Sequence, residues 1–211
     1  MTAKSWAWFV MTLLAFGVAL YAMNVALVPD ARSPVVTSLI ERMPAVAFSH
    51  FIGGAVAIAV GALQFSTRIR TRIVTVHRWL GRTYVLAILI SGSAGLYLAI
   101  NSSGGAAARW GFGLLAGAWL AATFTAYRNI RHGRVAAHRQ WMIRSYAITL
   151  AALTLRFYLP AAQMLELPMG TAYQTIAWLC WVPNLIVAEW FIRSGKREAR
   201  VGQAASQLAN G

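Results

Sequence analysis

The sequence predicts an all-α fold, a polytopic bundle of about six transmembrane helices with both termini on the cytoplasmic side. Of the 211 residues, 59% are hydrophobic and only 11% are charged, whereas a soluble domain carries about 25% charged residues. The mean hydropathy is +0.58. The charges also fall in short clusters between long apolar runs, which is typical of a chain solvated by lipid.

Six apolar stretches are long enough for helices that cross about 30 Å of hydrocarbon, which takes about 20 residues. Most of them carry Trp or Tyr at one end, as expected for rings at the headgroup level. The first is longer than the apolar core of a signal peptide and shows no small-residue cleavage site, so we expect an uncleaved span. The stretches are Trp6–Leu27, Ala45–Phe65, Trp79–Ile100, Trp110–Tyr127, Trp141–Leu159 and Tyr173–Ile192.

The positive charges predict the orientation. The formal net charge is +14, and fifteen of the Lys and Arg residues lie on the side of the N-terminus. The loops on the other side hold only Arg32, Arg42 and Arg109. This asymmetry follows the positive-inside rule and places both termini in the cytoplasm, beside anionic lipids. Because the clusters alternate with apolar runs, we expect lipid headgroups and no nucleic acid as their partners.

Outside the spans, the first external loop has a structure of its own. Ser33 and Pro34 are a good N-cap and first helical residue, and Pro44 ends the segment. They predict a short amphipathic helix on the membrane surface or folded over the bundle. We expect one transmembrane domain over residues 1–194 and a disordered basic tail over 195–211.

Small residues recur at four-residue spacing in the second and fourth spans. Such rows let helix backbones approach closely in lipid. A slot for a flat cofactor is the alternative interpretation. The rows are Gly53, Ala57, Gly61 and Gly113, Gly117, Ala121.

Two segments repeat one pattern, in which a basic stretch leads to His-Arg, then Trp, then Arg-(Thr/Ser)-Tyr. The first reads H-R-W-L-G-R-T-Y over His77–Tyr84, and the second reads H-R-Q-W-M-I-R-S-Y over His138–Tyr146. Spans two–three and four–five are therefore predicted to form a parallel internal repeat, with halves at about 45–100 and 110–163.

These motifs, with T-L-R-F-Y-L-P over Thr154–Pro160, resemble the bacterial family catalogued as domain of unknown function 2306. The resemblance covers roughly residues 45–165. It implies a multi-pass protein of the bacterial inner membrane, and no particular activity.

The repeat places His77 and His138 at equal depth on two helices, which is what axial ligation of a b-type haem requires. A quinone is the other redox cofactor considered for this region. The neighbouring arginines would hold propionates; they are Arg78, Arg82, Arg139 and Arg144. Against haem stands the simpler reading that His-Arg pairs at an interface hydrogen-bond loops or lipid phosphates.

Arg156 is an ionisable residue at membrane depth, where such groups usually face an interior and mark function. Counting about 1.5 Å per residue puts it in one layer with His50. No carboxylate lies at that depth, so the guanidinium needs carbonyls, water or an anionic ligand. We expect a small polar cavity here, with Ser145, Thr149 and Ala152 on one wall.

Few residues remain for other chemistry. Glu189 is the one acidic residue expected within a span, where it should pair with an arginine, and Cys180 should be buried. No metal site, phosphate loop or nucleophilic triad is evident. Three hypotheses stay open: a haem or quinone redox protein, a transporter or binding protein for a small anion, and a non-catalytic component that holds anionic lipid, a membrane protein or a second copy of the chain.

Overall fold

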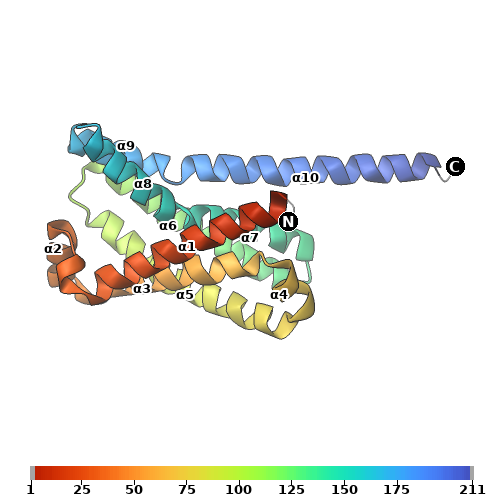
Figure 1. Cartoon of the computed structure of the whole chain (residues 1–211), viewed down its shortest axis with the longest axis horizontal. Coiled ribbons are helices and arrows are strands. Elements are labelled where there is room, and N and C mark those ends of the chain that lie inside the picture. Colours follow the sequence, from red (N-terminus) through yellow and green to blue (C-terminus); the bar gives the residue numbers. More distant parts are fainter. Residues whose placement is uncertain (1–2, 210–211) are drawn as a thin grey trace.

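The computed structural model describes residues 3–209, and the side chains of residues 5–195. In that part of the chain the regular elements are helices, and they form one elongated bundle (Figure 1). The all-α prediction is therefore confirmed. The elements are α1 (Ala3–Leu27), η1 (Pro29–Ala31), α2 (Pro34–Arg42), α3 (Pro44–Gln64), α4 (Thr67–Arg72), α5 (Val74–Ile100), α6 (Ala106–Arg131), α7 (Val135–Thr149), α8 (Ala151–Met164), α9 (Met169–Leu179) and α10 (Val182–Ala209).

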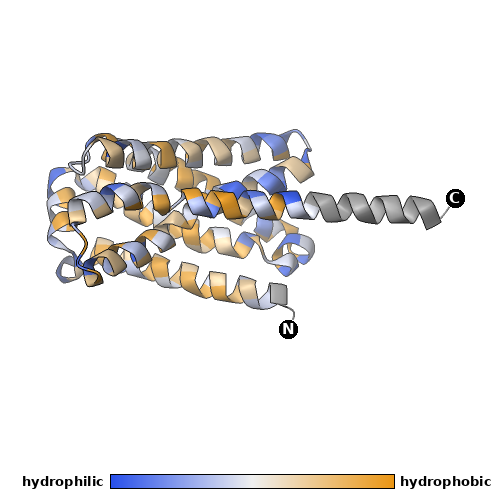
Figure 2. Cartoon of the chain, turned by 90° about the horizontal axis from the view of Figure 1, so that it is seen from above, coloured by the Kyte–Doolittle hydropathy of each residue, from blue (hydrophilic) through white to orange (hydrophobic). Residues whose placement is uncertain are grey.

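Four helical stretches are long and apolar enough to cross a membrane. They are Ser5–Leu27, Pro44–Gln64, Val74–Ile100 and Met169–Gly195. The other two expected spans correspond to α6, which carries arginines at both ends, and to α7 with α8, which are separate helices of 15 and 14 residues. Hydrophobic residues run along the bundle, and hydrophilic residues gather towards its two ends (Figure 2).

Two of the expected spans are interrupted helices. α9 ends before Cys180 and α10 begins at Val182, because Pro183 has no N–H to continue the ladder. The carbonyl of Cys180 instead accepts hydrogen bonds from Asn184 Nδ2, at 3.1 Å, and from the Thr154 hydroxyl. Side chains of this kind satisfy backbone groups that a broken helix frees at membrane depth.

The predicted surface helix is confirmed as α2. Ser33 Oγ accepts a hydrogen bond from the backbone N–H of Val36 at 3.4 Å, and Pro34 opens the helix. Ile40 is buried, and α2 packs on α3. Before it, Arg32 donates to the carbonyls of Val25 and Ala26, at 3.0 and 2.8 Å, and so caps the end of α1.

One end of the bundle carries most of the basic residues of the loops. The start of α1, α4 and the turn between α6 and α7 lie at this end, and α2 and α9 lie at the opposite one (Figure 1). We call it the basic end, after Arg68, Arg70, Arg72, Arg128, Arg131 and Arg134. The disorder predicted for 195–211 concerns residues whose side chains lie outside the described part, and it stays a prediction.

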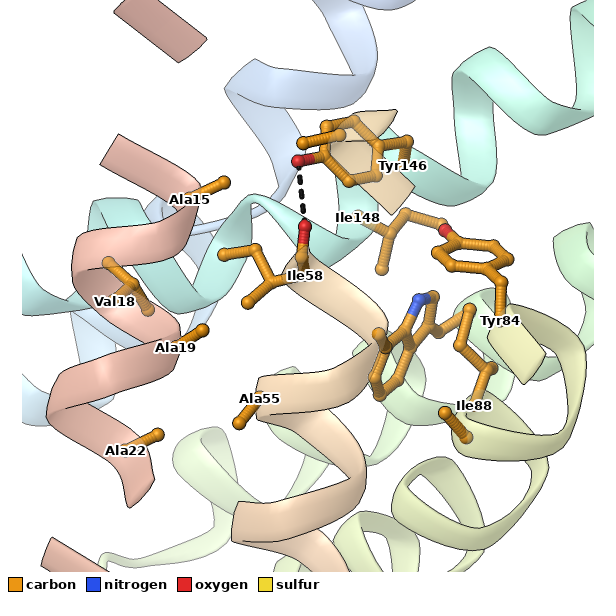
Figure 3. Close-up of a cluster of buried hydrophobic side chains, with 14 of the residues drawn as sticks. Ala15, Val18, Ala19, Ala22, Ala55, Ile58, Tyr84, Ile88, Tyr146 and Ile148 are labelled. Atoms are coloured by element: carbon orange, nitrogen blue, oxygen red, sulfur yellow. Dashed lines mark hydrogen bonds between the residues drawn. The ribbon is translucent and has the colours of Figure 1, made fainter. Parts of the chain in front are cut away.

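Small residues let α1 and α3 pack closely. Alanines of α1 face α3 across a thin layer of side chains (Figure 3). Close backbone approach of this kind holds helices together in lipid, where no hydrophobic force acts between them. The residues that meet are Ala15, Val18, Ala19 and Ala22 of α1, and Ala55 and Ile58 of α3.

The two rows of small residues differ in what packs against them. On α3, Gly53 packs against Ala87 and Ser91, and Gly61 lies against the rings of Tyr84 and Tyr146. On α6, a Cβ added at Gly113 or Gly117 would meet nothing within 4 Å. The first row is therefore a packing surface, whereas the second faces open space.

Gly61 has no room for a side chain. A Cβ there would lie 2.5 Å from Tyr146 and 2.7 Å from Tyr84. Neither ring can swing away freely, because Tyr146 donates to the Ile58 carbonyl at 3.1 Å and Tyr84 is hydrogen-bonded to Ser145 and Thr149. We expect Gly61→Ala to lower the stability by about 1–3 kcal/mol, the usual cost of overpacking, measured by thermal unfolding in detergent.

Gly117→Ala is the matched control, because the same added methyl group meets open space. It should leave Tm unchanged or slightly raised. Equal Tm values for the two variants would contradict the packing described for Gly61.

Candidate functional site

His77 and His138 occupy the same position in their helices. Each is the fourth residue, of α5 and of α7 respectively. Each backbone N–H makes the first bond of its helix, to the carbonyls of Ile73 and Arg134 at 3.1 and 2.9 Å. Both histidines therefore lie at the basic end, on the first turn of a helix that enters the bundle.

The helix packing turns the two histidines towards one region. α5 packs on α3 and α6, and α7 packs on α6 and α3, so α5 and α7 face each other diagonally. The Tyr84 hydroxyl of α5 reaches Ser145 Oγ of α7 at 2.9 Å. His77 and His138 each lie 7 residues before these residues, which is two turns and about 10 Å along the same helix faces. The two rings are close enough to interact electrostatically.

The ring nitrogens differ in their partners. His138 Nδ1 lies 2.9 Å from the carbonyl of Ala126. A carbonyl only accepts, so Nδ1 donates its proton to this bond, and Nε2 is the ring nitrogen left for another partner. His77 Nδ1 is buried without a hydrogen-bond partner. The His77 carbonyl accepts a bond from Gln64 Nε2 of α3 at 3.3 Å.

The expected arginines are only partly gathered around this pair. Arg78 and, from α4, Arg70 lie within electrostatic range of His77. Sequence reasoning counted Arg70 only as a loop charge. Arg139 is exposed, and Arg82 lies 4.9 Å from the centre of the exposed Trp79 ring.

Arg144 points elsewhere. Its Nε and Nη2 donate to the two carboxylate oxygens of Glu189 on α10, and its guanidinium lies 4.6 Å from the centre of the Trp141 ring. The predicted pairing of Glu189 with an arginine is therefore confirmed. This pairing directs Arg144 towards α10 and away from the histidine pair. To hold a propionate as predicted, Arg144 would have to do so while it is bonded to Glu189.

Between the two candidate sites lies a cluster of buried hydroxyl groups that the sequence did not reveal. Tyr84 bonds Ser145 and Thr149 at 2.9 and 3.0 Å. Trp119 Nε1 donates to Thr149 Oγ1 at 2.9 Å, and Thr123 Oγ1 lies 2.7 Å from Ser145 Oγ. Each polar group has a partner, so this cluster joins α5, α6 and α7 and offers no free ligand-binding group.

The opposite half of the bundle holds His50 and Arg156. His50 Nδ1 lies 3.0 Å from the carbonyl of Ser91, whose hydroxyl donates to the His50 carbonyl at 2.8 Å. Arg156 Nη1 donates to the Ala152 carbonyl at 2.7 Å, and the guanidinium lies 5.1 Å from the centre of the Tyr21 ring on α1. Arg156 is within electrostatic range of His50, so the two residues lie in the same part of the bundle, and their sharing of one ligand site stays a prediction.

The residues expected to line a cavity beside Arg156 lie elsewhere in the structure. Ser145 and Thr149 belong to the hydroxyl cluster and do not line a space beside Arg156. The reason is that the two segments pack on different helices: Thr149, at the end of α7, bonds Tyr84 of α5, whereas α8, which begins at Ala151, packs on α9 and α1. The prediction treats α7 and α8 as one continuous helical stripe, whereas α8 presents Arg156 to Tyr21 of α1. Pro160, one turn further, also leaves the Arg156 carbonyl without its helical donor.

Two buried side-chain atoms in the described part of the chain lack a hydrogen-bond partner. They are His77 Nδ1 and Arg156 Nε. A buried polar group without a partner costs about 1–3 kcal/mol, so each such atom in a native structure needs an explanation. One of them lies in each candidate site.

Comparison with known proteins identifies one family. The profile described as "Predicted membrane protein (DUF2306)" matches residues 47–192. The match begins within α3 and ends within α10, so it includes both histidine positions and Arg156. No curated protein and no solved structure matches the chain.

Proposed function

The chain belongs to the DUF2306 family of predicted membrane proteins, and from this premise we propose that it is a six-span redox protein of the bacterial inner membrane that binds haem b between His77 and His138. The observation that carries the proposal is the buried, unpartnered Nδ1 of His77 beside a second histidine at the same helix position.

Six crossings are supported by the lengths of the helical segments. In addition to the four apolar stretches, α6 has 26 residues, and α7 and α8 follow each other with only Leu150 between them. One crossing needs roughly 20 residues. α6 alone exceeds this length, and α7 and α8 exceed it together. The positive-inside rule makes the basic end cytoplasmic, which puts both termini in the cytoplasm.

The internal repeat supplies the symmetry of the proposed site. His77 and His138 are equivalent residues of the two repeated motifs, and both are fourth in their helices. Cofactor sites in four-helix bundles are built in this way, from side chains on facing helices. The diagonal placement of α5 and α7 directs one ligand from each half towards the bundle axis.

The hydrogen bond made by His138 favours ligation. Its Nδ1–H is bonded to the Ala126 carbonyl, an arrangement that fixes the tautomer and raises the basicity of the other nitrogen in metal-bound histidines. Among the described residues, no three His, Cys, Asp or Glu side chains gather into a metal site. A haem needs only two axial protein ligands, because its own ring supplies the remaining four. Bound haem supplies a one-electron iron couple.

Basic residues near His77 suit the acidic side chains of a haem. Arg70 and Arg78 lie within electrostatic range of the ring. Arg139 adjoins the second histidine in sequence and is exposed. Arginine binds carboxylates in a bidentate manner, so these residues would hold the propionates at the basic end.

A second candidate function is the binding of a small anion by Arg156 and His50. The specific observation is that Arg156 Nε is buried without a partner, while only Nη1 makes a hydrogen bond, to its own helix. A guanidinium has five N–H donors. At membrane depth such a group needs a polar or occupied interior, and an anion beside Nε would satisfy it.

The proposed topology predicts the location of reporter fusions. Fusions within residues 67–76 and after Lys196 should read cytoplasmic, and fusions within residues 101–108 should read external, because fifteen basic residues are then inside. Paired reporters that are active on opposite sides of the membrane make the measurement. An external reading for the C-terminus contradicts the six-span topology.

The haem proposal predicts a visible absorption spectrum for the purified protein. Protein produced with ample haem should show b-type bands on reduction, and His77→Ala or His138→Ala should each abolish them, because each removes one axial ligand. His132→Ala is the matched control, since His132 lies exposed in the turn between α6 and α7. Its spectrum should match that of the wild type.

The haem proposal fails if the folded protein stays colourless, or if the bands survive both substitutions. Size-exclusion profiles and Tm values of each variant confirm that a lost spectrum reflects a lost ligand and not a lost fold.

For the anion site, salts of chloride, nitrate and phosphate are compared at constant ionic strength by their effect on Tm. An anion at 100 times its Kd should stabilise the wild type by about 2.7 kcal/mol. Arg156→Leu should remove this stabilisation, whereas Arg42→Leu, a control at an exposed arginine of the same end, should retain it. Stabilisation that persists in Arg156→Leu contradicts the site.

A further inference from the structure

A groove of about 780 Å³ runs between α7 and α10, with α6 as its floor. Its volume lies in the range of about 300–1,000 Å³ that small-molecule sites occupy. The floor consists of alanines, and tryptophans and aliphatic side chains form the walls. The residues that the argument uses are Ala118, Ala121, Trp141, Arg144, Glu189 and Arg193.

The charges of the groove are concentrated at one end. Among the described side chains that line this end, Arg144 and Arg193 are the cations and Glu189 is the carboxylate, so the described lining carries a net positive charge. Glu189 holds both Nε and Nη2 of Arg144, and the Trp141 ring stacks on the same guanidinium. Arg193, one helical turn beyond Glu189, is exposed at the mouth.

The other end of the groove continues as an apolar track along α6. Ala121 and Gly117 are one turn apart on the same face, and both are exposed. A Cβ added at Gly117 or at Gly113 would meet open space. No helix of the described bundle covers this row, in contrast to the glycines of α3.

We propose that this groove binds an anionic phospholipid, with its phosphate beside Arg193 and one acyl chain along Ala121 and Gly117. Charge complementarity selects this occupant. A cationic end that opens into an apolar track matches the chemistry of one acidic headgroup and one hydrocarbon chain. A second copy of the chain is disfavoured, because it would bring its own basic end against this one, and each chain has a net charge of +14.

The lipid stabilises the contact between α10 and the bundle. α10 packs on α7 and α9, and the side chains of Arg144 and Glu189, which line the groove, are 19% and 34% exposed. A phosphate beside Arg193 would offset the excess positive charge there. Arg193, the proposed headgroup contact, is not among the residues proposed to hold the haem, whereas Arg144 lines the groove through its ion pair with Glu189.

Native mass spectrometry of the full chain in detergent tests the proposal, with phosphatidylglycerol and phosphatidylcholine of identical acyl chains as titrants. The first phosphatidylglycerol should bind more tightly than phosphatidylcholine. Arg193→Gln should weaken it about fivefold, since one basic side chain near an acidic headgroup contributes about 1 kcal/mol. Arg128→Gln is the control: it removes one exposed charge from α6 at the same basic end and should change the affinity by less than about twofold.

A groove-filling variant tests the acyl chain separately. Ala121→Trp should abolish the tight site, whereas Leu89→Trp introduces the same ring at an exposed position of α5, outside the groove and away from the small residues of α6, and should retain it. Equal losses in Arg193→Gln and Arg128→Gln overturn the proposal, as does tight phosphatidylglycerol binding that survives Ala121→Trp. A wild-type dimer that Ala121→Trp converts to monomer, with lipid binding unchanged, assigns the groove to a second copy and overturns it as well.

Discussion

The bundle depends on one requirement, that polar groups buried at membrane depth find partners within the protein. Water is absent there, so an unsatisfied hydroxyl or amide is costly. Tyr84 meets this requirement by bonding Ser145 and Thr149 across the bundle, and Trp119 and Thr123 complete the cluster. These bonds are directional, whereas the apolar contacts around them are not. They therefore determine how far α5, α6 and α7 slide along one another, and with that the relative heights of everything else on these helices.

The same requirement sets the pairing of α3 with α5. His50 is bonded to Ser91 near one end of the pair, and Gln64 is bonded to the His77 carbonyl near the other. Between them, Gly61 receives the Tyr84 ring. His77, Tyr84 and Ser91 follow at intervals of 7 residues, so they share one face of α5. This polar stripe connects the two candidate sites through the hydroxyl cluster, and it places the polar groups that bond α3 and α7 along a single line of the 27-residue α5.

Against this background of satisfied groups, the two exceptions are informative. Within the described residues, His77 Nδ1 and Arg156 Nε are the buried side-chain atoms without a partner, although serines and threonines elsewhere in the bundle satisfy even the carbonyls of a broken helix. A protein that satisfies its interior so thoroughly gains nothing from leaving these two nitrogens unbonded. We therefore interpret both as groups that are kept for a ligand, a haem at the basic end and an anion at the opposite half.

The sequence by itself determined the all-α class, the helical segments, the surface helix at Pro34, the pairing of Glu189 with an arginine, and the prominence of His77, His138, His50 and Arg156. These follow from local periodicity, turn residues and the cost of charge in lipid, which act within a few residues of the chain. Only the tertiary structure decided that the glycines of α3 are packed against other helices while the small residues of α6 face open space. It also decided that Arg144 turns to α10 and that Arg70 approaches His77. Finally, it placed Ser145 and Thr149 against Tyr84 instead of Arg156. The physical reason is that the neighbour of each helix face depends on contacts between residues far apart in the sequence, and only the packing of distant helices sets those contacts.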